Sequence, residues 1–188
     1  MNDTEEKIRN SALKYFLRYG FNKSSIDEIA EDAGVGKGTV YNYFSNKQEL
    51  FTKTSIWWRE KQFKKIEIEI DKIERADDKI LMLLNLEVMS FRKAYKEYGM
   101  TAKVMCELIS LKESNEVLEK RDIELYQNYL EQGYKQGIFY KQPFRQYAEL
   151  LNTTVFQFAK RWIIDMNEAN AVNEINTLFG LMLKAMKT

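Results

Sequence analysis

The chain has 188 residues, a formal net charge of +1, 45% hydrophobic residues and 30% charged residues. These values predict a soluble globular protein with enough apolar material for one large domain or two smaller ones. The complete lack of histidine excludes imidazole base catalysis, Ser-His and Cys-His nucleophiles and His-ligated metals. The chain also lacks a phosphate-binding glycine loop. We therefore expect no enzyme, no bound metal and no cofactor.

The single cysteine, Cys106, rules out an internal disulfide and is typical of a reducing cytoplasm. We expect Cys106 to be a small buried hydrophobe, with a redox switch as the alternative. The chain opens without a basic-then-apolar leader, and no run approaches the ~18–20 apolar residues of a membrane span. The sequence thus predicts a cytoplasmic protein with no membrane partner.

Helical periodicity dominates the chain. One proline and eight glycines leave long segments uninterrupted, and alternating runs of β-branched residues are scarce. The sequence predicts an all-α fold of about nine helices: a three-helix helix-turn-helix domain, a long fourth helix, and a C-terminal helical bundle. The expected helices cover residues 4–19, 26–33, 37–43, 46–73, 80–98, 100–111, 115–136, 144–166 and 169–187.

The stretch from Ser24 to Lys47 carries the helix-turn-helix pattern. Two short apolar-periodic segments, residues 26–33 and 37–43, flank Gly34-Val35-Gly36, and a glycine-bearing break of this length lets two helices meet at a steep angle. Capping boxes that begin at Ser25 and Ser45 mark the starts of the second and fourth helices. The acidic face of the second helix cannot contact phosphate, so we expect it to point away from DNA.

The third expected helix carries side chains suited to DNA. Asn42 can read adenine through two hydrogen bonds, and Lys37 can reach guanine O6 and N7. The alternative is that the glycine-bearing segment is only a tight corner and the polar residues form a solvated face. Donors for phosphate oxygens come from Thr39, Tyr41, Tyr43 and Lys47.

Residues 8–50 resemble the N-terminal domain of the TetR family of bacterial transcriptional regulators. The resemblance rests on residues at fixed spacing: Ile8, Ala12, Phe16, Gly20, Ser25-Ile26, Ile29-Ala30, Ala33-Gly34-Val35, Gly38-Thr39-Val40-Tyr41, Tyr43-Phe44, Lys47 and Leu50. It implies base contacts from Lys37, Tyr41 and Asn42, and phosphate contacts from Ser25, Thr39, Tyr43 and Lys47. The chain departs from the commoner family pattern at Gly36, where Ser or Thr is frequent, and at Asn42-Tyr43, where a bulky residue and often a histidine occur.

The resemblance also implies a DNA-binding domain over residues 1–48 and a ligand-binding and dimerisation domain over residues 49–188. A homodimer would form through the helices at residues 144–166 and 169–187, whose apolar stripes could otherwise complete a monomeric core. An effector pocket would lie among the middle helices, where few charges are expected on inward faces. Side chains that could line it, or could simply be core, are Trp57, Trp58, Met82, Leu86, Met89, Met105, Tyr126, Phe156 and Trp162.

Together with these residue patterns, the resemblance implies a ligand-responsive transcriptional regulator, a repressor that binds a palindromic double-stranded operator as a dimer and is released by a small, mainly apolar ligand. One alternative is a constitutive or architectural DNA-binding protein without an effector. Another is a helical carrier of small molecules in which the N-terminal helices only dock. Protection of two half-sites on DNA, and its response to ligands, would separate the three.

Overall fold

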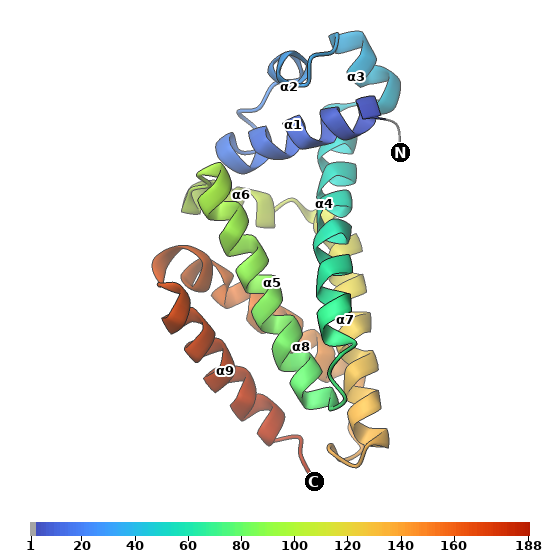
Figure 1. The fold of residues 1–188 in the computed structure, drawn as a ribbon, viewed down its shortest axis with the longest axis vertical. Helices are drawn as coiled ribbons and strands as arrows, with labels where there is room; N and C mark the ends of the chain where they lie inside the picture. The colour runs from blue at the N-terminus through green and yellow to red at the C-terminus, as the bar shows by residue number, and fades with distance from the viewer. Residues whose placement is uncertain (1–2) are drawn as a thin grey trace. The chain divides into compact units, whose positions relative to one another are not determined.

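The structure, a computed structural model, describes residues 3–188, apart from the side chains of residues 109, 112–115, 117 and 160. Its described part consists of helices and their connections, with one isolated β-bridge between Phe139 and Lys187, which confirms the all-α prediction. The helices in Figure 1 are α1 (Asp3–Tyr19), α2 (Ile26–Asp32), α3 (Lys37–Tyr43), α4 (Lys47–Ile70), α5 (Ala76–Tyr98), α6 (Ala102–Ile109), α7 (Lys112–Lys135), α8 (Phe144–Lys160), the π-helix Arg161–Asp165 and α9 (Glu168–Lys184).

Several helix limits differ from the sequence prediction by one to four residues, and two of the differences have an identifiable cause. The α5 helix begins at Ala76 rather than near residue 80, and the Ala76 N–H donates to Gln136 Oε1 at 3.0 Å. Its first turn contains Asp77 and Asp78, carboxylates that the positive end of a helix favours. The helix predicted over residues 144–166 is not a continuous α-helix, because α8 ends at Lys160 and the π-helix begins at Arg161.

The capping residues confirm one sequence prediction and correct another. Ser25 caps α2 in a complete capping box, with its side chain accepting from the Glu28 N–H and Glu28 reaching back to the Ser25 N–H. The prediction that Ser45 caps the fourth helix is wrong. The cap is Asn46, whose Oδ1 accepts from the Glu49 N–H at 2.8 Å, and Glu49 reaches back to the Ser45 N–H instead. Asn is as good a cap as Ser, so the helix starts one residue later.

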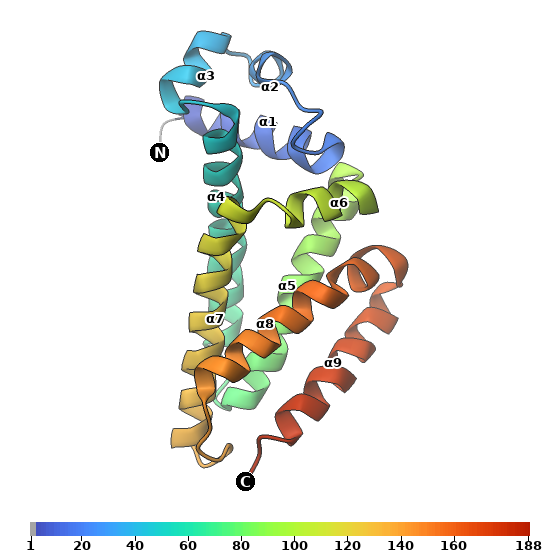
Figure 2. The same cartoon turned by 180° about the vertical axis from the view of Figure 1, so that it is seen from behind.

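Two compact units divide the chain, and each is described by itself. The first combines the residues up to Gln62 with Ala94–Glu116, so α6 belongs with the helix-turn-helix. Figures 1 and 2 both show α6 beside the C-terminal end of α1. Leu108 of α6 and the following Leu111 pack against the core of these helices. That core comprises Ile8, Ala12, Phe16, Ile26, Ile29, Ala30, Val40, Phe44, Leu50 and Phe51.

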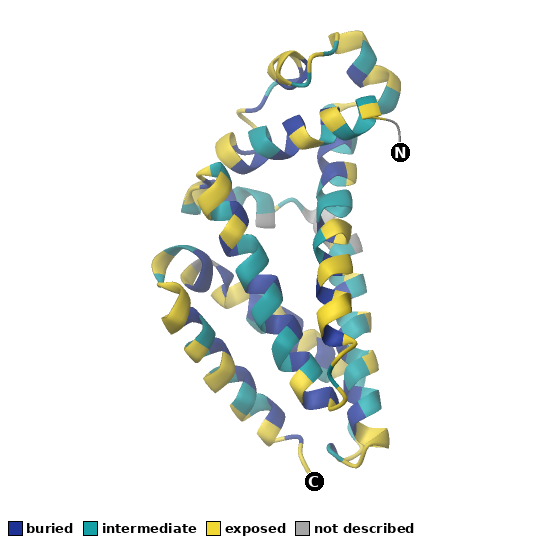
Figure 3. Ribbon diagram, viewed as in Figure 1, coloured by how far each residue is buried: buried dark blue, intermediate teal, exposed yellow. Residues whose placement is uncertain are grey.

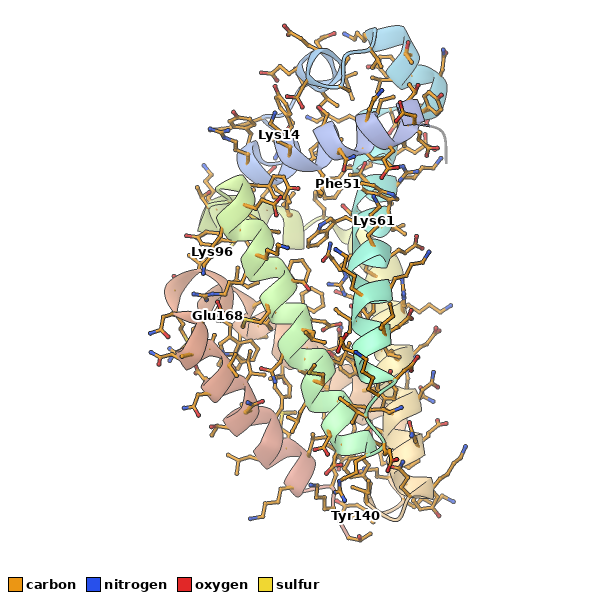
Figure 4. All side chains as sticks on the ribbon, in the orientation of Figure 1. Lys14, Phe51, Lys61, Lys96, Tyr140 and Glu168 are labelled. Carbon is orange, nitrogen blue, oxygen red and sulfur yellow. The ribbon has the colours of Figure 1, made fainter. Side chains whose placement is uncertain are left out.

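Aromatic packing fixes the first unit internally. The rings of Phe16 and Phe51 meet edge to face with centroids 5.1 Å apart, and Phe51 is labelled on α4 in Figure 4. Lys61, also labelled there, forms an ion pair with Glu6 of α1 at 2.5 Å.

The predicted boundary between a DNA-binding domain and a ligand-binding domain after residue 48 stays a prediction, because the two compact units reflect packing and do not report function. The prediction of a buried Cys106 is wrong, because this α6 residue is exposed.

The second unit contains Phe63–Lys93 and Val117–Thr188. Buried and exposed positions alternate along α9 (Figure 3), where Ala171, Ile175, Phe179 and Leu183 recur every fourth residue and are buried. This spacing places one apolar stripe along the helix. The C-terminal end is tied to the connection after α7, since the Tyr140 N–H donates to Met186 O at 3.2 Å.

Charged side chains lie inside the second unit, contrary to the sequence prediction that inward faces carry few charges. Glu87 and Arg92 of α5 and Asp122 of α7 are all buried. The Tyr126 hydroxyl donates to Glu87 Oε2 at 2.8 Å. Helical periodicity missed these residues because a charged side chain becomes buried where tertiary packing supplies hydrogen-bond partners, which periodicity does not reveal.

Arg92 explains how the π-helix is accommodated. A π turn breaks the regular helical hydrogen-bond ladder and leaves carbonyls in need of other donors. The Arg92 guanidinium donates to Trp162 O at 2.5 Å, to Ile163 O at 3.4 Å and to Met166 O. One buried cation therefore supplies the donors that this turn requires.

Candidate nucleic-acid interface

The α3 helix presents one buried and one exposed side, as its sequence predicts. Val40 is fully buried and Phe44, at the C-cap, is 1% exposed, so these two residues anchor the helix to the core. Gly36 serves as the N-cap with no side-chain hydrogen bond. On the other side Lys37, Tyr41 and Asn42 are exposed, while Thr39 and Tyr43 are half-buried. The anchored side leaves the opposite side of α3 facing solvent.

Lys37 has a partner that the sequence prediction did not foresee. Its Nζ lies 2.9 Å from Asp27 Oδ2, in an exposed ion pair between the first turn of α2 and the first residue of α3. The hydrogen bond to Asp27 raises the pKa of Lys37, so the charged ammonium form is stabilised. Asp27 belongs to the acidic face of α2 that is expected to point away from DNA, yet it contacts Lys37, a residue predicted to read bases, so that expectation stays a prediction for Asp27.

Ser25 is engaged within its own helix. Its hydroxyl donates to Glu28 Oε2 at 2.6 Å and accepts from the Glu28 N–H at 3.2 Å. The side chain is half-buried. A phosphate contact from Ser25 stays a prediction, and it requires the hydroxyl to exchange its bond to Glu28 for one to the phosphate.

Lys47 is folded back onto the turn between α1 and α2. Its Nζ lies 4.6 Å from the centroid of the Phe21 ring and 3.4 Å from Asn22 O. Burial lowers the pKa of Lys47, and the nearby Glu107 carboxylate offsets part of that shift. The bond to Asn22 O is long, so the ammonium group can leave it for a phosphate oxygen at little cost.

Glu107 is a residue of this region that sequence reasoning missed. Its Oε1 accepts from the Asn22 N–H at 2.8 Å, from 85 residues further along the chain. Gly20, with a φ of +87°, brings the backbone close enough that an added Cβ would lie 2.7 Å from Glu107 Oε2. No local sequence signal connects α6 to this turn, because the contact depends on how two distant helices pack.

The predicted pocket residues fall into both compact units. Trp57, Trp58 and Met105 belong to the first unit, and Met82, Leu86, Met89, Tyr126, Phe156 and Trp162 to the second. Within the second unit, Trp162 is fully buried and its ring stacks on Phe158 at 5.3 Å. Trp57 carries the Lys61 ammonium 4.2 Å from its ring centroid. Their joint role in ligand binding stays a prediction.

One open cavity of about 420 Å³ lies on the first unit and contains none of those nine residues. Its lining includes the ion pair between Lys14, labelled in Figure 4, and Asp32. Hydrogen bonding to Lys14 outweighs burial and lowers the pKa of Asp32. The charged groups at this cavity are therefore paired, Lys14 with Asp32 of the lining and Lys7 with Asp3 outside it. The lining residues are Lys7, Asn10, Ser11, Lys14, Asp32, Ala33 and Tyr98.

The described residues contain neither a three-ligand metal cluster nor a membrane-spanning helix. Over that part of the chain, no three cysteine or acidic side chains are arranged to share a metal ion. No helix in the same residues combines the length and apolar character needed to cross a membrane.

Comparison with known proteins identifies the N-terminal segment. Residues 8–54 match the family model described as bacterial regulatory proteins, tetR family. The uncharacterized HTH-type transcriptional regulator YhgD of Bacillus subtilis is 25% identical over 140 residues, which cover 72% of this chain and 71% of YhgD.

Two solved structures share the fold over nearly the whole length. The fatty acid degradation regulator FadR from Bacillus halodurans has a TM-score of 0.76 at 18% identity and covers 95% of each chain. FadR from Bacillus subtilis in complex with stearoyl-CoA also has a TM-score of 0.76, at 22% identity, over 95% of this chain and 97% of that one. At these identities the likeness concerns the fold alone.

Proposed function

We propose that this chain, which belongs to the TetR family of bacterial regulatory proteins, represses transcription as a dimer on a palindromic operator and leaves the DNA when it binds a small, mainly apolar ligand. Its role as a transcriptional regulator follows from the family itself. A protein with this task works in the cytoplasm, where the chromosome lies.

The observation that carries the proposal is the arrangement of α3. Its apolar side is held by Val40 and Phe44, and its other side offers Lys37, Tyr41 and Asn42 to solvent. A short helix fixed in this way can enter the major groove and present its outer side chains to base edges. Lys47, at the start of α4, supplies a cation beside it for the phosphate backbone.

Exposed apolar residues on the last helices support dimerisation. Leu150 and Phe158 of α8 and Leu181 of α9 are 55%, 37% and 64% exposed. Exposed hydrophobic residues mark a surface that a partner covers when they form one continuous patch, which the proposed dimer through α8 and α9 requires of these three. A two-fold dimer through α8 and α9 would offer two recognition helices to two half-sites of a palindrome.

The effector is proposed to be a small molecule with an apolar body. The fold neighbour FadR of Bacillus subtilis binds stearoyl-CoA, so this fold can accommodate a long acyl chain. Buried Glu87 and Asp122 add polar groups to the interior of the second unit, which suits a ligand that also carries a polar group. The ligand would act by favouring a conformer that no longer matches adjacent grooves.

The test is selection of bound genomic fragments by the purified protein, followed by footprinting. Protection of a short palindrome on two half-sites is the expected outcome, and failure to bind any DNA would refute the proposal. Lys47→Ala should weaken binding to all sequences and reduce the salt slope by about one unit. Asn42→Ala should instead relax specificity at one position, so equal losses on operator and random DNA would contradict its role.

Repeating the footprint with candidate ligands separates a ligand-responsive repressor from a constitutive DNA-binding protein. Acyl and other amphipathic molecules are expected to raise the melting temperature and release the operator, because a ligand that favours one conformer stabilises it. Purely polar anions of matched charge serve as the control. Binding of only the polar anions would contradict the proposed effector class.

A further inference from the structure

Asp27, in the first turn of α2, and Lys37, the first residue of α3, form an exposed ion pair. The Lys37 Nζ lies 2.9 Å from Asp27 Oδ2, and the two side chains retain 52% and 66% of their exposure. An exposed pair of this kind contributes little to folding. Lys37 is the first residue of α3, so the pair stands at the N-terminal end of the proposed recognition helix.

The phosphates repel a carboxylate at a DNA interface, and a hydrogen bond from a nearby donor is needed to offset that repulsion. The pair with Lys37 is neutral overall, so it adds no net attraction to the backbone. Base edges are different, because the major groove presents donors as well as acceptors. The pair is therefore better suited to reading bases than to binding phosphate.

We infer that Asp27 and Lys37 act together as one reader of a G·C base pair in each operator half-site. The inference rests on the proposed DNA-binding function and assigns to Asp27 a role in sequence specificity. Lys37 donates to guanine, and Asp27 accepts from the cytosine paired with it.

The donors and acceptors of the pair match those of the base pair. A lysine ammonium has three N–H groups, and one of them already donates to Asp27. The other two can reach guanine N7 and O6, and the Asp27 carboxylate has lone pairs left for the cytosine N4 amino group. An A·T pair places the adenine N6 amino donor against the ammonium and the thymine O4 acceptor against the carboxylate, so it fits poorly.

Neighbouring residues fit the same orientation. Tyr41 follows Lys37 by four residues on α3, so the two side chains share a helical face, and Tyr41 is 45% exposed. Asn42 lies beside that face and is also exposed. The Asp27–Lys37 pair would thus read one end of the half-site while the next turn of α3 contacts its neighbours.

The test is selection of bound sequences from a random DNA library, with the base preference measured at every half-site position. The proteins compared are the unaltered chain, Asp27→Asn, Lys37→Ala and the control Glu31→Gln. Glu31 is exposed one turn further along α2 and carries the same charge, so it reports the general effect of removing a negative charge. Melting temperatures confirm that each variant is folded.

The unaltered chain is expected to prefer G·C at one position of each half-site. Asp27→Asn and Lys37→Ala should each lower that preference at least about fivefold, at the same position, while Glu31→Gln leaves it unchanged. An Asp27→Asn profile identical to that of the unaltered chain would overturn the inference. Tighter binding of Asp27→Asn to every sequence would also overturn the inference, because Asp27 would then act only by repelling the phosphates.

A charge swap keeps the inference testable if a single variant is unstable. Asp27→Lys combined with Lys37→Asp retains an ion pair but reverses the order of donor and acceptor, so the G·C preference should disappear. A retained preference would refute the joint role. If the unaltered chain selects no sequence at all, the proposed DNA-binding function fails; if it selects a palindrome that Asp27→Asn does not alter, only the G·C reader fails.

Discussion

Replacing Gly20 by alanine should destabilise the protein more than replacing Gly34, although both glycines have a positive φ. Gly20 has a φ of +87° and Gly34 a φ of +68°, and a residue with a Cβ pays roughly 1–2 kcal/mol in this region. An added Cβ at Gly34 meets nothing within 4 Å, whereas at Gly20 it would lie 2.7 Å from Glu107 Oε2.

The difference between the two variants comes from Glu107. A carboxylate at the end of a flexible side chain can move aside, but moving it breaks the 2.8 Å hydrogen bond from the Asn22 N–H. A hydrogen bond to a charged group contributes about 1.5–3 kcal/mol, and we take about 1 kcal/mol here because the contact is exposed. Gly20→Ala should therefore cost about 2–3 kcal/mol and Gly34→Ala about 1–2 kcal/mol.

Urea unfolding of the two variants gives the free energies of unfolding directly. In thermal unfolding, each kcal/mol should lower the melting temperature by about 2–4 °C for a chain of this length. The matched control is the Glu107→Ala background, where Gly20→Ala should cost no more than Gly34→Ala. Equal costs in the unaltered background, or an excess cost that persists without Glu107, would refute the reasoning.

Three further outcomes follow from other parts of the structure. Arg92→Met should lower the free energy of unfolding by about 3 kcal/mol in urea titration, since it leaves three carbonyls at the π-helix without their donor; the exposed neighbour Lys93→Met should have little effect. Leu150→Lys with Leu181→Lys should raise the dimer dissociation constant at least about a hundredfold in sedimentation analysis, whereas lysine at Ile68, 62% exposed on α4, should not. The Lys53 ammonium and the Ser45 hydroxyl and N–H lower the pKa of Glu49 from 4.5 to about 2, so its contribution to stability is present above about pH 4.5 and is lost as the pH falls through 2. Glu49→Gln should remove that part of the acid dependence, and an unchanged acid-unfolding curve would contradict it.

Local features of the sequence predicted the helix-turn-helix well. The segment around Gly34 and the inward positions of Val40 and Phe44 follow from glycine geometry and helical periodicity, which act over a few residues. The Ser25 capping box is equally local, since its partners lie three residues apart. The sequence prediction chose Ser45 instead of Asn46 as the cap of α4. The two residues are adjacent and have similar capping strength, so only the backbone conformation decides which of them caps the helix.

What the sequence determined by itself was therefore the helical class, the turn that separates α2 from α3, and the side of α3 that anchors it. Only the tertiary structure decided the partners of the polar groups: Asp27 for Lys37, Glu107 for the Asn22 N–H, and Arg92 for the carbonyls of the π-helix. The physical reason is range. Periodicity and capping are settled within one or two turns, whereas a hydrogen bond between residues 22 and 107 exists only after distant helices have packed and brought a donor to its acceptor.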